Sequence, residues 1–76
     1  MPFGEYAYRQ VADDIARRIE AGEITAKLPS ERELAGEYGV AYATVRRAMT
    51  ELRARGAVRT AGTRGTFVAG TGPTGP

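Results

Sequence analysis

The chain has 76 residues, which is enough for one small domain. It contains no cysteine and no histidine, so disulfide bonds and the usual zinc sites are excluded, and we expect no metal and no other cofactor. The hydrophobic fraction of 42% is ordinary for a globular chain, and no apolar run approaches the ~20 residues of a membrane span. The amino terminus also lacks the basic and then apolar pattern of a secretion signal. We therefore expect a soluble, cytoplasmic protein that has no membrane partner.

The net charge of +2 is unevenly distributed along the chain. Residues 1–40 carry five basic and eight acidic side chains, a net charge of −3, whereas residues 41–76 carry six arginines and one acid, a net charge of +5. Such an asymmetry indicates that the carboxy-terminal half faces a polyanion. An ordinary solvated basic surface is the alternative interpretation.

The first periodic segment predicts a helix over about residues 5–21. Its apolar stripe has helical spacing and consists of Tyr8, Val11, Ala12, Ile15 and Ile19. Gly22 can adopt the left-handed conformation that ends a helix. In the connection that follows, Pro29 favours an extended Leu28, so residues 27–28 can form a short strand.

The second and third predicted helices form a helix-turn-helix. Ser30 and Glu33 have the spacing of a capping box, which predicts a helix that starts at Ser30 and ends at Gly39. A third helix is predicted over about residues 42–55. The apolar stripes of the two helices are Leu34, Ala35 and Tyr38, and then Val45, Ala48, Met49 and Leu52. The very short break after Gly39 forces the two helices to cross steeply.

Two short strands are predicted after Gly56, over residues 57–60 and 66–69. The connection between them contains Gly62 and Gly65, which allow the positive φ angles of a hairpin. We expect the hairpin to close the core with Val58, Phe67 and Val68. The predicted fold is α+β, a small winged helix-turn-helix of three helices and a β-hairpin wing over residues 1–69. Residues 70–76 contain only Gly, Thr and Pro, so we expect a disordered tail.

Catalysis has little support in the residues. Without His or Cys, a general base would have to be a carboxylate or the only lysine, Lys27. Asp13 and Asp14 are adjacent on a helix and so point in different directions, about 100° apart. We therefore expect that the chain is not an enzyme.

One face of the third predicted helix is suited to duplex DNA. Opposite its apolar stripe lie Tyr42, Ala43, Arg46, Arg47 and Thr50. Guanidinium forks match guanine edges and phosphates, and small polar groups match phosphate oxygens. Thr44 lies in the first turn, where a hydroxyl and free backbone N–H groups can meet a phosphate. A merely solvated face would normally interleave glutamates with the arginines, and here the first acid is Glu51.

The predicted hairpin offers a second DNA-binding element. Arg59 and Arg64 flank the tip, and Gly62 and Gly65 allow the backbone to approach a groove closely. Arginine is the side chain that a narrow minor groove attracts. Arginines that serve only solubility are the alternative.

These residues resemble the DNA-binding domain of GntR-type bacterial transcription regulators over about residues 6–69. The similar stretches are YRQVA (8–12), LPSERELA (28–35), GV (39–40), TVRRA (44–48) and GTFV (65–68). The resemblance implies DNA contacts by Arg32, Thr44 and Arg46, and a wing tip that reaches the minor groove. It also implies a dimer on a palindromic operator and a carboxy-terminal domain that binds a metabolite.

The sequence departs from the family pattern at four places. Ala41 and Tyr42 replace Ser-Arg or Thr-Arg, which removes a helix cap and a DNA-contacting arginine. The connection over residues 22–28 is about two residues shorter than usual. Thr63 stands where a wing glycine is usual, after Gly62. The effector domain is missing, so we expect no small-molecule effector site within these residues.

The resulting hypothesis is a sequence-specific double-stranded DNA-binding protein, a bacterial transcription regulator and repressor. The helix over about 42–55 would enter the major groove, and the wing over about 57–69 would lie at the minor groove. The predicted DNA-binding residues are Arg32, Tyr42, Ala43, Thr44, Arg46, Arg47, Arg59, Gly62, Thr63 and Arg64. We expect a monomer or weak homodimer that pairs on a palindromic operator. A winged-helix adaptor for a partner protein, or the DNA-binding portion of a longer effector-responsive regulator, is the alternative.

Overall fold

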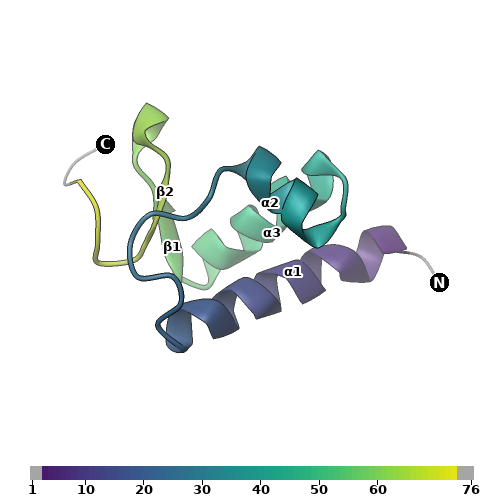
Figure 1. Cartoon of the computed structure of the whole chain (residues 1–76), viewed down its shortest axis with the longest axis horizontal. Helices are drawn as coiled ribbons and strands as arrows, with labels where there is room; N and C mark the ends of the chain where they lie inside the picture. The colour runs from purple at the N-terminus through teal and green to yellow at the C-terminus, as the bar shows by residue number, and fades with distance from the viewer. Residues whose placement is uncertain (1–2, 74–76) are drawn as a thin grey trace.

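The computed structural model describes residues 3–73, which form three helices and a two-stranded antiparallel sheet (Figure 1). The helices are α1 (Phe3–Glu20), α2 (Glu31–Tyr38) and α3 (Tyr42–Ala54), and the strands are β1 (Val58–Thr60) and β2 (Thr66–Val68). A single 3₁₀ turn, Gly62–Arg64, lies between the strands. The predicted α+β winged helix-turn-helix is confirmed. In the described part of the chain, no helix is both long and apolar enough to cross a membrane.

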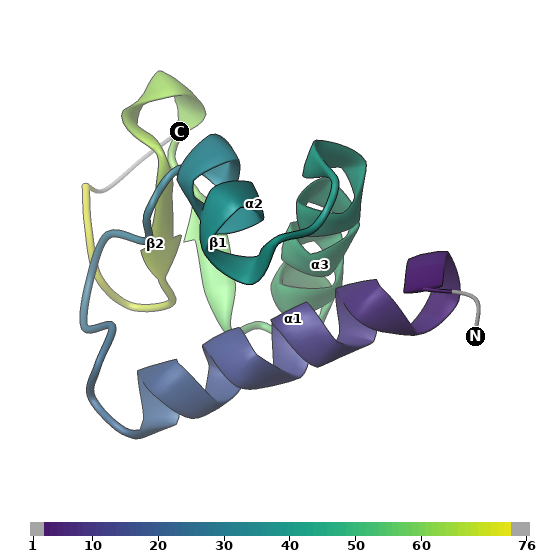
Figure 2. The same ribbon diagram turned by 45° about the vertical axis from the view of Figure 1, so that its right-hand side comes forward.

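Helix α1 lies along one side of the α2–α3 pair (Figures 1 and 2). Val11, Ala12 and Ile15 from the predicted stripe are buried, while Tyr8 and Ile19 are half-buried at its margins. The helix begins two residues earlier than predicted and ends at Glu20, within the usual uncertainty of helix ends.

The ends of α2 and the start of α3 lie where the local signals in the sequence predict them. Ser30 Oγ accepts a hydrogen bond from the Glu33 N–H at 3.1 Å, and the Glu33 carboxylate accepts one from the Ser30 N–H at 3.0 Å. Gly39 ends α2 with φ of 65°. Ala41 occupies the N-cap position of α3, where its methyl group provides no hydrogen-bond acceptor. The first turn of α2 is therefore capped by side chains, and that of α3 is not.

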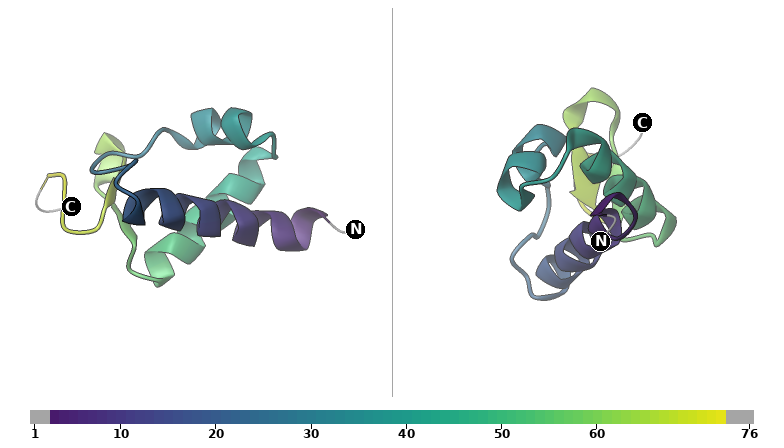
Figure 3. Two further views of the ribbon diagram at one scale, coloured as in Figure 1. Left: turned by 60° about the horizontal axis from the view of Figure 1, so that its bottom comes forward. Right: turned by 90° about the vertical axis from the view of Figure 1, so that its right-hand side faces the viewer.

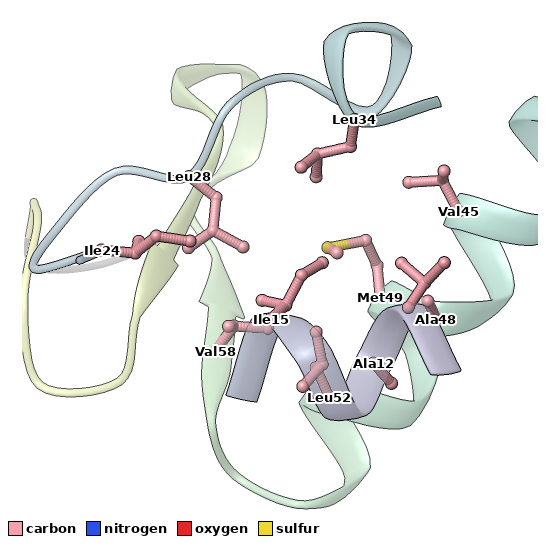
Figure 4. Packing of buried hydrophobic residues seen from close by; sticks show 11 residues of the cluster. Ala12, Ile15, Ile24, Leu28, Leu34, Val45, Ala48, Met49, Leu52 and Val58 are labelled. Atoms are coloured by element: carbon pink, nitrogen blue, oxygen red, sulfur yellow. The ribbon is translucent and has the colours of Figure 1, made fainter. Parts of the chain in front are cut away.

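The core lies where the three helices meet. Leu34, Met49 and Ile15, one from each helix, point into the same interior space (Figure 4). Ile24 and Leu28, in the connection after α1, are also buried, although no helical period marks them as core residues in the sequence. Both fill the side of the core toward the hairpin (Figure 4).

This connection adds a short third edge to the hairpin. Lys27 forms an isolated antiparallel bridge with Phe67, as predicted for a short strand at residues 27–28. The Leu28 N–H donates to the Thr66 carbonyl oxygen at 2.9 Å, and the Val68 N–H donates to that of Ala26 at 2.8 Å. The wing is thereby anchored to the segment that leads into α2.

The predicted burial of Phe67 is confirmed, but its side chain lies outside the main core cluster. Val58 pairs with Val68 and Arg59 pairs with Phe67 across the hairpin, and successive residues of a strand point to opposite faces. Val58 and Val68 pack on the core cluster, so Phe67 lies on the other face with Arg59. Phe67 is nonetheless only 9% exposed, because Gly72 passes over its ring: a Cβ at Gly72 would lie 2.6 Å from two ring carbons.

Residues 70–73 of the predicted tail lie along this outer face of the hairpin. The Arg59 guanidinium donates to the Thr71 carbonyl oxygen at 2.9 and 3.2 Å and also to that of Pro73. The Thr71 hydroxyl donates to the Val68 carbonyl oxygen at 2.7 Å. We call residues 70–73 the strap. The strap and the Phe3 end of α1 lie at opposite ends of the molecule (Figure 3). The rest of the predicted tail, residues 74–76, is outside the described residues.

Polar contacts tie α1 to α2. The Tyr38 hydroxyl donates to Asp14 Oδ2 at 2.6 Å and accepts from Arg18 at 3.0 Å. The Tyr38 hydrogen bond, followed by that from Arg17, lowers the pKa of Asp14. Burial is the main cause that raises the pKa of Tyr38.

Candidate nucleic-acid interface

Helix α3 has one buried and one exposed face, as its sequence period predicts. Val45, Ala48, Met49 and Leu52 are all buried. The residues Tyr42, Ala43, Arg46, Arg47 and Thr50 are exposed, and Thr44 is half-buried. The predicted exposure of this face is therefore confirmed.

Tyr42 joins residues of α2 and α3 at the start of this exposed face. The Arg32 guanidinium lies 5.4 Å from the centroid of the Tyr42 ring, and that of Arg46 lies 5.9 Å from it. The Tyr42 hydroxyl donates to Glu31 Oε1 at 3.1 Å. Two guanidinium groups are thus held beside one aromatic ring, close enough for a cation–π attraction. We call Arg32, Tyr42 and Arg46 the recognition cluster.

The acidic groups near the recognition cluster already have partners. Glu31 accepts from Tyr42, and Glu33 is engaged in the capping box. The backbone hydrogen bond from Ser30 is the main cause that lowers the pKa of Glu33. Both carboxylates also lie in the first turn of α2, where the helix dipole favours negative charge. The presence of two acids beside the recognition cluster is therefore explained: Glu33 caps α2, and Glu31 accepts the hydrogen bond that orients Tyr42.

Arg47 points away from the recognition cluster, toward α1. Its guanidinium lies 4.1 Å from the centroid of the Tyr8 ring, and Arg9 Nε donates to the Tyr8 hydroxyl at 3.1 Å. Sequence periodicity placed Arg47 on the exposed face but did not reveal that Tyr8 would receive it. Adjacent residues of a helix diverge by about 100°, which is why Arg46 and Arg47 take separate neighbours.

A groove of about 870 Å³ separates the start of α2 from the wing, with α3 at its base. Its charged lining residues are Lys27, Glu31, Arg32, Glu33, Arg53 and Arg64. Arg53 donates to Thr60 Oγ1 at 3.1 Å and to Thr50 Oγ1 at 3.3 Å, so it links α3 to β1. This link joins the wing to α3 beside the groove. The sequence gives no sign of this role for Arg53, because only the folded chain brings Thr60 beside it.

The wing tip presents Gly62, Thr63 and Arg64, which are all exposed. Gly62 has φ of 56° and Gly65 has φ of 120°, so the glycines supply the positive φ angles that were predicted. At Gly65, a Cβ would lie 2.9 Å from Lys27 Cε, so this glycine also lets the lysine side chain pass close to the wing.

The structure separates the predicted DNA-binding residues into groups. Arg32, Tyr42 and Arg46 come together, with Ala43 and Thr44 on the same turn of α3. Gly62, Thr63 and Arg64 form the wing tip. Arg47 is directed to α1, and Arg59 is directed to the strap on the outer face of the hairpin.

The helix-turn-helix, the exposed face of α3 and the hairpin define the class of the protein as a winged helix-turn-helix domain. The sequence profile of the family described as "Bacterial regulatory proteins, gntR family" matches residues 7–68. The chain belongs to this family.

Curated relatives and solved structures agree with this family. The chain is 37% identical over 73 residues to HTH-type transcriptional regulator Rv1152 of Mycobacterium tuberculosis, covering 93% of the chain and 60% of that protein. It is 38% identical over 63 residues to HTH-type transcriptional repressor NagR of Bacillus subtilis, covering 80% of the chain and 26% of that protein. The AraR DNA-binding domain in complex with operator ORR3 has a TM-score of 0.76 and 36% identity, covering 82% of this chain and 77% of that one. The chain thus spans less than two thirds of the length of these two curated relatives.

Proposed function

We propose that this chain binds double-stranded DNA sequence-specifically and is the DNA-binding unit, over residues 1–69, of a cytoplasmic bacterial transcription repressor. The recognition cluster is the observation that carries the proposal. Arg32 from α2 and Arg46 from α3 converge on Tyr42 at the start of the exposed face. Forked donors held in place on the outer helix of a helix-turn-helix suit base edges in the major groove and the phosphates beside them. The family and the operator-bound AraR structures support this assignment.

In this proposal each group of residues has a separate task. Arg46 and Tyr42 read base edges, while Arg32, Ala43 and Thr44 contact the adjoining backbone. Gly62, Thr63 and Arg64 at the wing tip approach the minor groove, where arginine is favoured. One sugar–phosphate strand of the DNA lies along the groove between α2 and the wing, close to Lys27 and Arg64. Two copies of the chain pair on a palindromic operator, since such regulators match the two-fold symmetry of their sites.

Selection of bound duplexes from a random pool tests the proposal directly. We expect enrichment of one site with two-fold symmetry, and binding that weakens steeply with salt because each phosphate contact releases counterions. Arg46→Ala should lower affinity for the enriched site by about 1–3 kcal/mol and relax the preference at one base pair.

Arg17→Gln is the matched control, because Arg17 lies on α1 and pairs with Asp14 and Glu23. Its affinity and site preference should equal those of the unsubstituted protein. Failure to enrich any duplex would reject DNA binding and favour a winged-helix adaptor. Equal base preferences for Arg46→Ala and the unsubstituted protein would reject the reading role of Arg46.

A further inference from the structure

A second basic and aromatic cluster lies outside the recognition cluster, between α1 and α3. Tyr6, Tyr8, Arg9 and Arg47 line a concavity of about 300 Å³. It forms because the amino-terminal part of α1 and the start of α3 lie at the same end of the molecule (Figures 1 and 2). The Arg47 guanidinium covers the face of the Tyr8 ring at 4.1 Å, while Arg9 bonds the Tyr8 hydroxyl at 3.1 Å.

The charges of this cluster favour an anion. Both guanidinium groups lie within 6 Å of the centroid of one ring, at 4.1 and 5.8 Å, so two positive charges are gathered at this concavity and both would attract an anion bound there. Asp13 and Glu51 are acidic neighbours of Arg9, but both are paired with Arg55 at 2.9 Å and neither lines the concavity. Guanidinium groups bind phosphate oxygens through paired N–H donors, and such bonds are among the stronger ones in proteins.

The position of the cluster identifies which phosphate it fits. Arg46 and Arg47 are consecutive in α3, yet Arg46 lies beside Tyr42 and Arg47 lies on Tyr8. When Arg46 faces the bases, Arg47 is therefore directed to one side of the helix, toward the edge of the groove. The sugar–phosphate backbone forms that edge.

We propose that Tyr6, Tyr8, Arg9 and Arg47 form a binding site for a DNA backbone phosphate that flanks the base pairs read by α3. This proposal rests on the proposed function and extends the DNA contact from the helix-turn-helix to α1. Arg9 and Arg47 supply the donors, and Tyr8 positions both. The site contributes affinity without reading sequence, because phosphates are the same at every base pair.

The test compares Arg9→Gln with Arg17→Gln, the same substitution farther along α1. On the duplex enriched by selection, Arg9→Gln should lower affinity about five- to tenfold near 0.15 M salt and reduce the slope of log K against log salt by about 1. Its ranking of base substitutions should be that of the unsubstituted protein. Tyr8→Phe keeps the ring under Arg47 and removes the acceptor for Arg9, so its loss should be smaller.

Duplexes that carry one neutral methylphosphonate locate the phosphate. A methylphosphonate at one position outside the enriched base pairs should weaken DNA binding by the unsubstituted protein, and it should weaken binding by Arg9→Gln clearly less, because that variant has already lost one of the two donors. The proposal is overturned if no flanking position has this effect, or if Arg17→Gln changes affinity and slope as much as Arg9→Gln does. If the unsubstituted protein binds no duplex, the proposed function fails and the site fails with it. If the unsubstituted protein binds DNA normally and Arg9→Gln has the same affinity and salt slope, the phosphate site is rejected and the proposed function stands.

Discussion

The Tyr42 hydroxyl donates a hydrogen bond to Glu31 Oε1 at 3.1 Å and so links the first turn of α3 to that of α2. The same ring lies beside Arg32 and Arg46. Tyr42 stands where the family pattern has an arginine, and the structure gives it contacts that an arginine could not make with Arg32 and Arg46 without repulsion. Besides facing the bases in the proposed complex, Tyr42 therefore positions two guanidinium groups.

Tyr42→Ala should weaken DNA binding by about 1 kcal/mol, because Arg32 and Arg46 lose the ring that orders them before they meet DNA. Tyr42→Phe is the matched variant, since it keeps the ring and removes only the bond to Glu31. Its affinity should stay within about threefold of the unsubstituted protein, or about 0.7 kcal/mol. Fluorescence titration with the enriched duplex measures both variants. Equal losses for the two would mean that the hydroxyl, and not the ring, is responsible.

Ala41→Ser should stabilise the protein by about 1 kcal/mol, since a hydroxyl at the N-cap can accept a hydrogen bond from the first turn of α3. Urea unfolding followed by circular dichroism measures the change. Ala54→Ser adds the same hydroxyl at the exposed carboxy-terminal end of α3, where it can cap none of the first-turn N–H groups and where serine has a lower helix propensity than alanine. That control should not be stabilised. A gain of equal size in both variants would show that capping is not the cause.

Asp14 makes the stability of the fold depend on pH in the acid range. The hydrogen bond from Tyr38, followed by that from Arg17, lowers the pKa of Asp14 from the ordinary value of 3.8. Its contribution is therefore complete above that value and is lost as the pH falls through the lower pKa of the folded protein. The Tm of the unsubstituted protein should decrease in this range, and that of Asp14→Asn should decrease less.

Glu20→Gln removes an exposed carboxylate at the end of the same helix and is the control for Asp14→Asn. Thermal unfolding between pH 2 and 6 compares the three proteins, a window chosen to bracket the ordinary carboxylate range. The assignment to Asp14 is contradicted if Glu20→Gln flattens the pH dependence as much as Asp14→Asn.

Gly72→Ala should detach the strap from the hairpin. The new Cβ would lie 2.6 Å from the Phe67 ring, at a backbone φ of +82°. Gly70→Ala has the same backbone strain, with φ of +84°, but meets nothing within 4 Å. Both variants should lose about 1 kcal/mol from the strained backbone, and Gly72→Ala should lose more. Hydrogen exchange of the amides in β1 and β2 should accelerate further in Gly72→Ala. Equal exchange in the two variants would contradict a role for the strap in covering Phe67.

Local signals made α2 and α3 predictable from sequence. The Ser30–Glu33 capping box, Gly39 and the stripe of Val45, Ala48, Met49 and Leu52 all act within a few residues, and the folded chain retains each of them. The exposed face of α3 follows from the same period.

Contacts between distant segments were not predictable in this way. In β2, Phe67 and Val68 are adjacent apolar residues that must point to opposite faces, and their order does not reveal which face meets the core. In the folded chain Val68 faces the core, and the strap covers Phe67 on the opposite face. Likewise, the stacking of Arg47 on Tyr8 depends on how α1 crosses α3, which helical period alone does not specify.

The bonds from Arg59 to the strap have a mechanical consequence. Arg59 lies in β1, and the strap crosses the outer face of the hairpin whose far end is the wing tip. Gly72 also packs against Phe67, so the strap and the hairpin are joined at two points. A force applied at Pro73 is therefore borne by β1 through Arg59 as well as by the connecting chain.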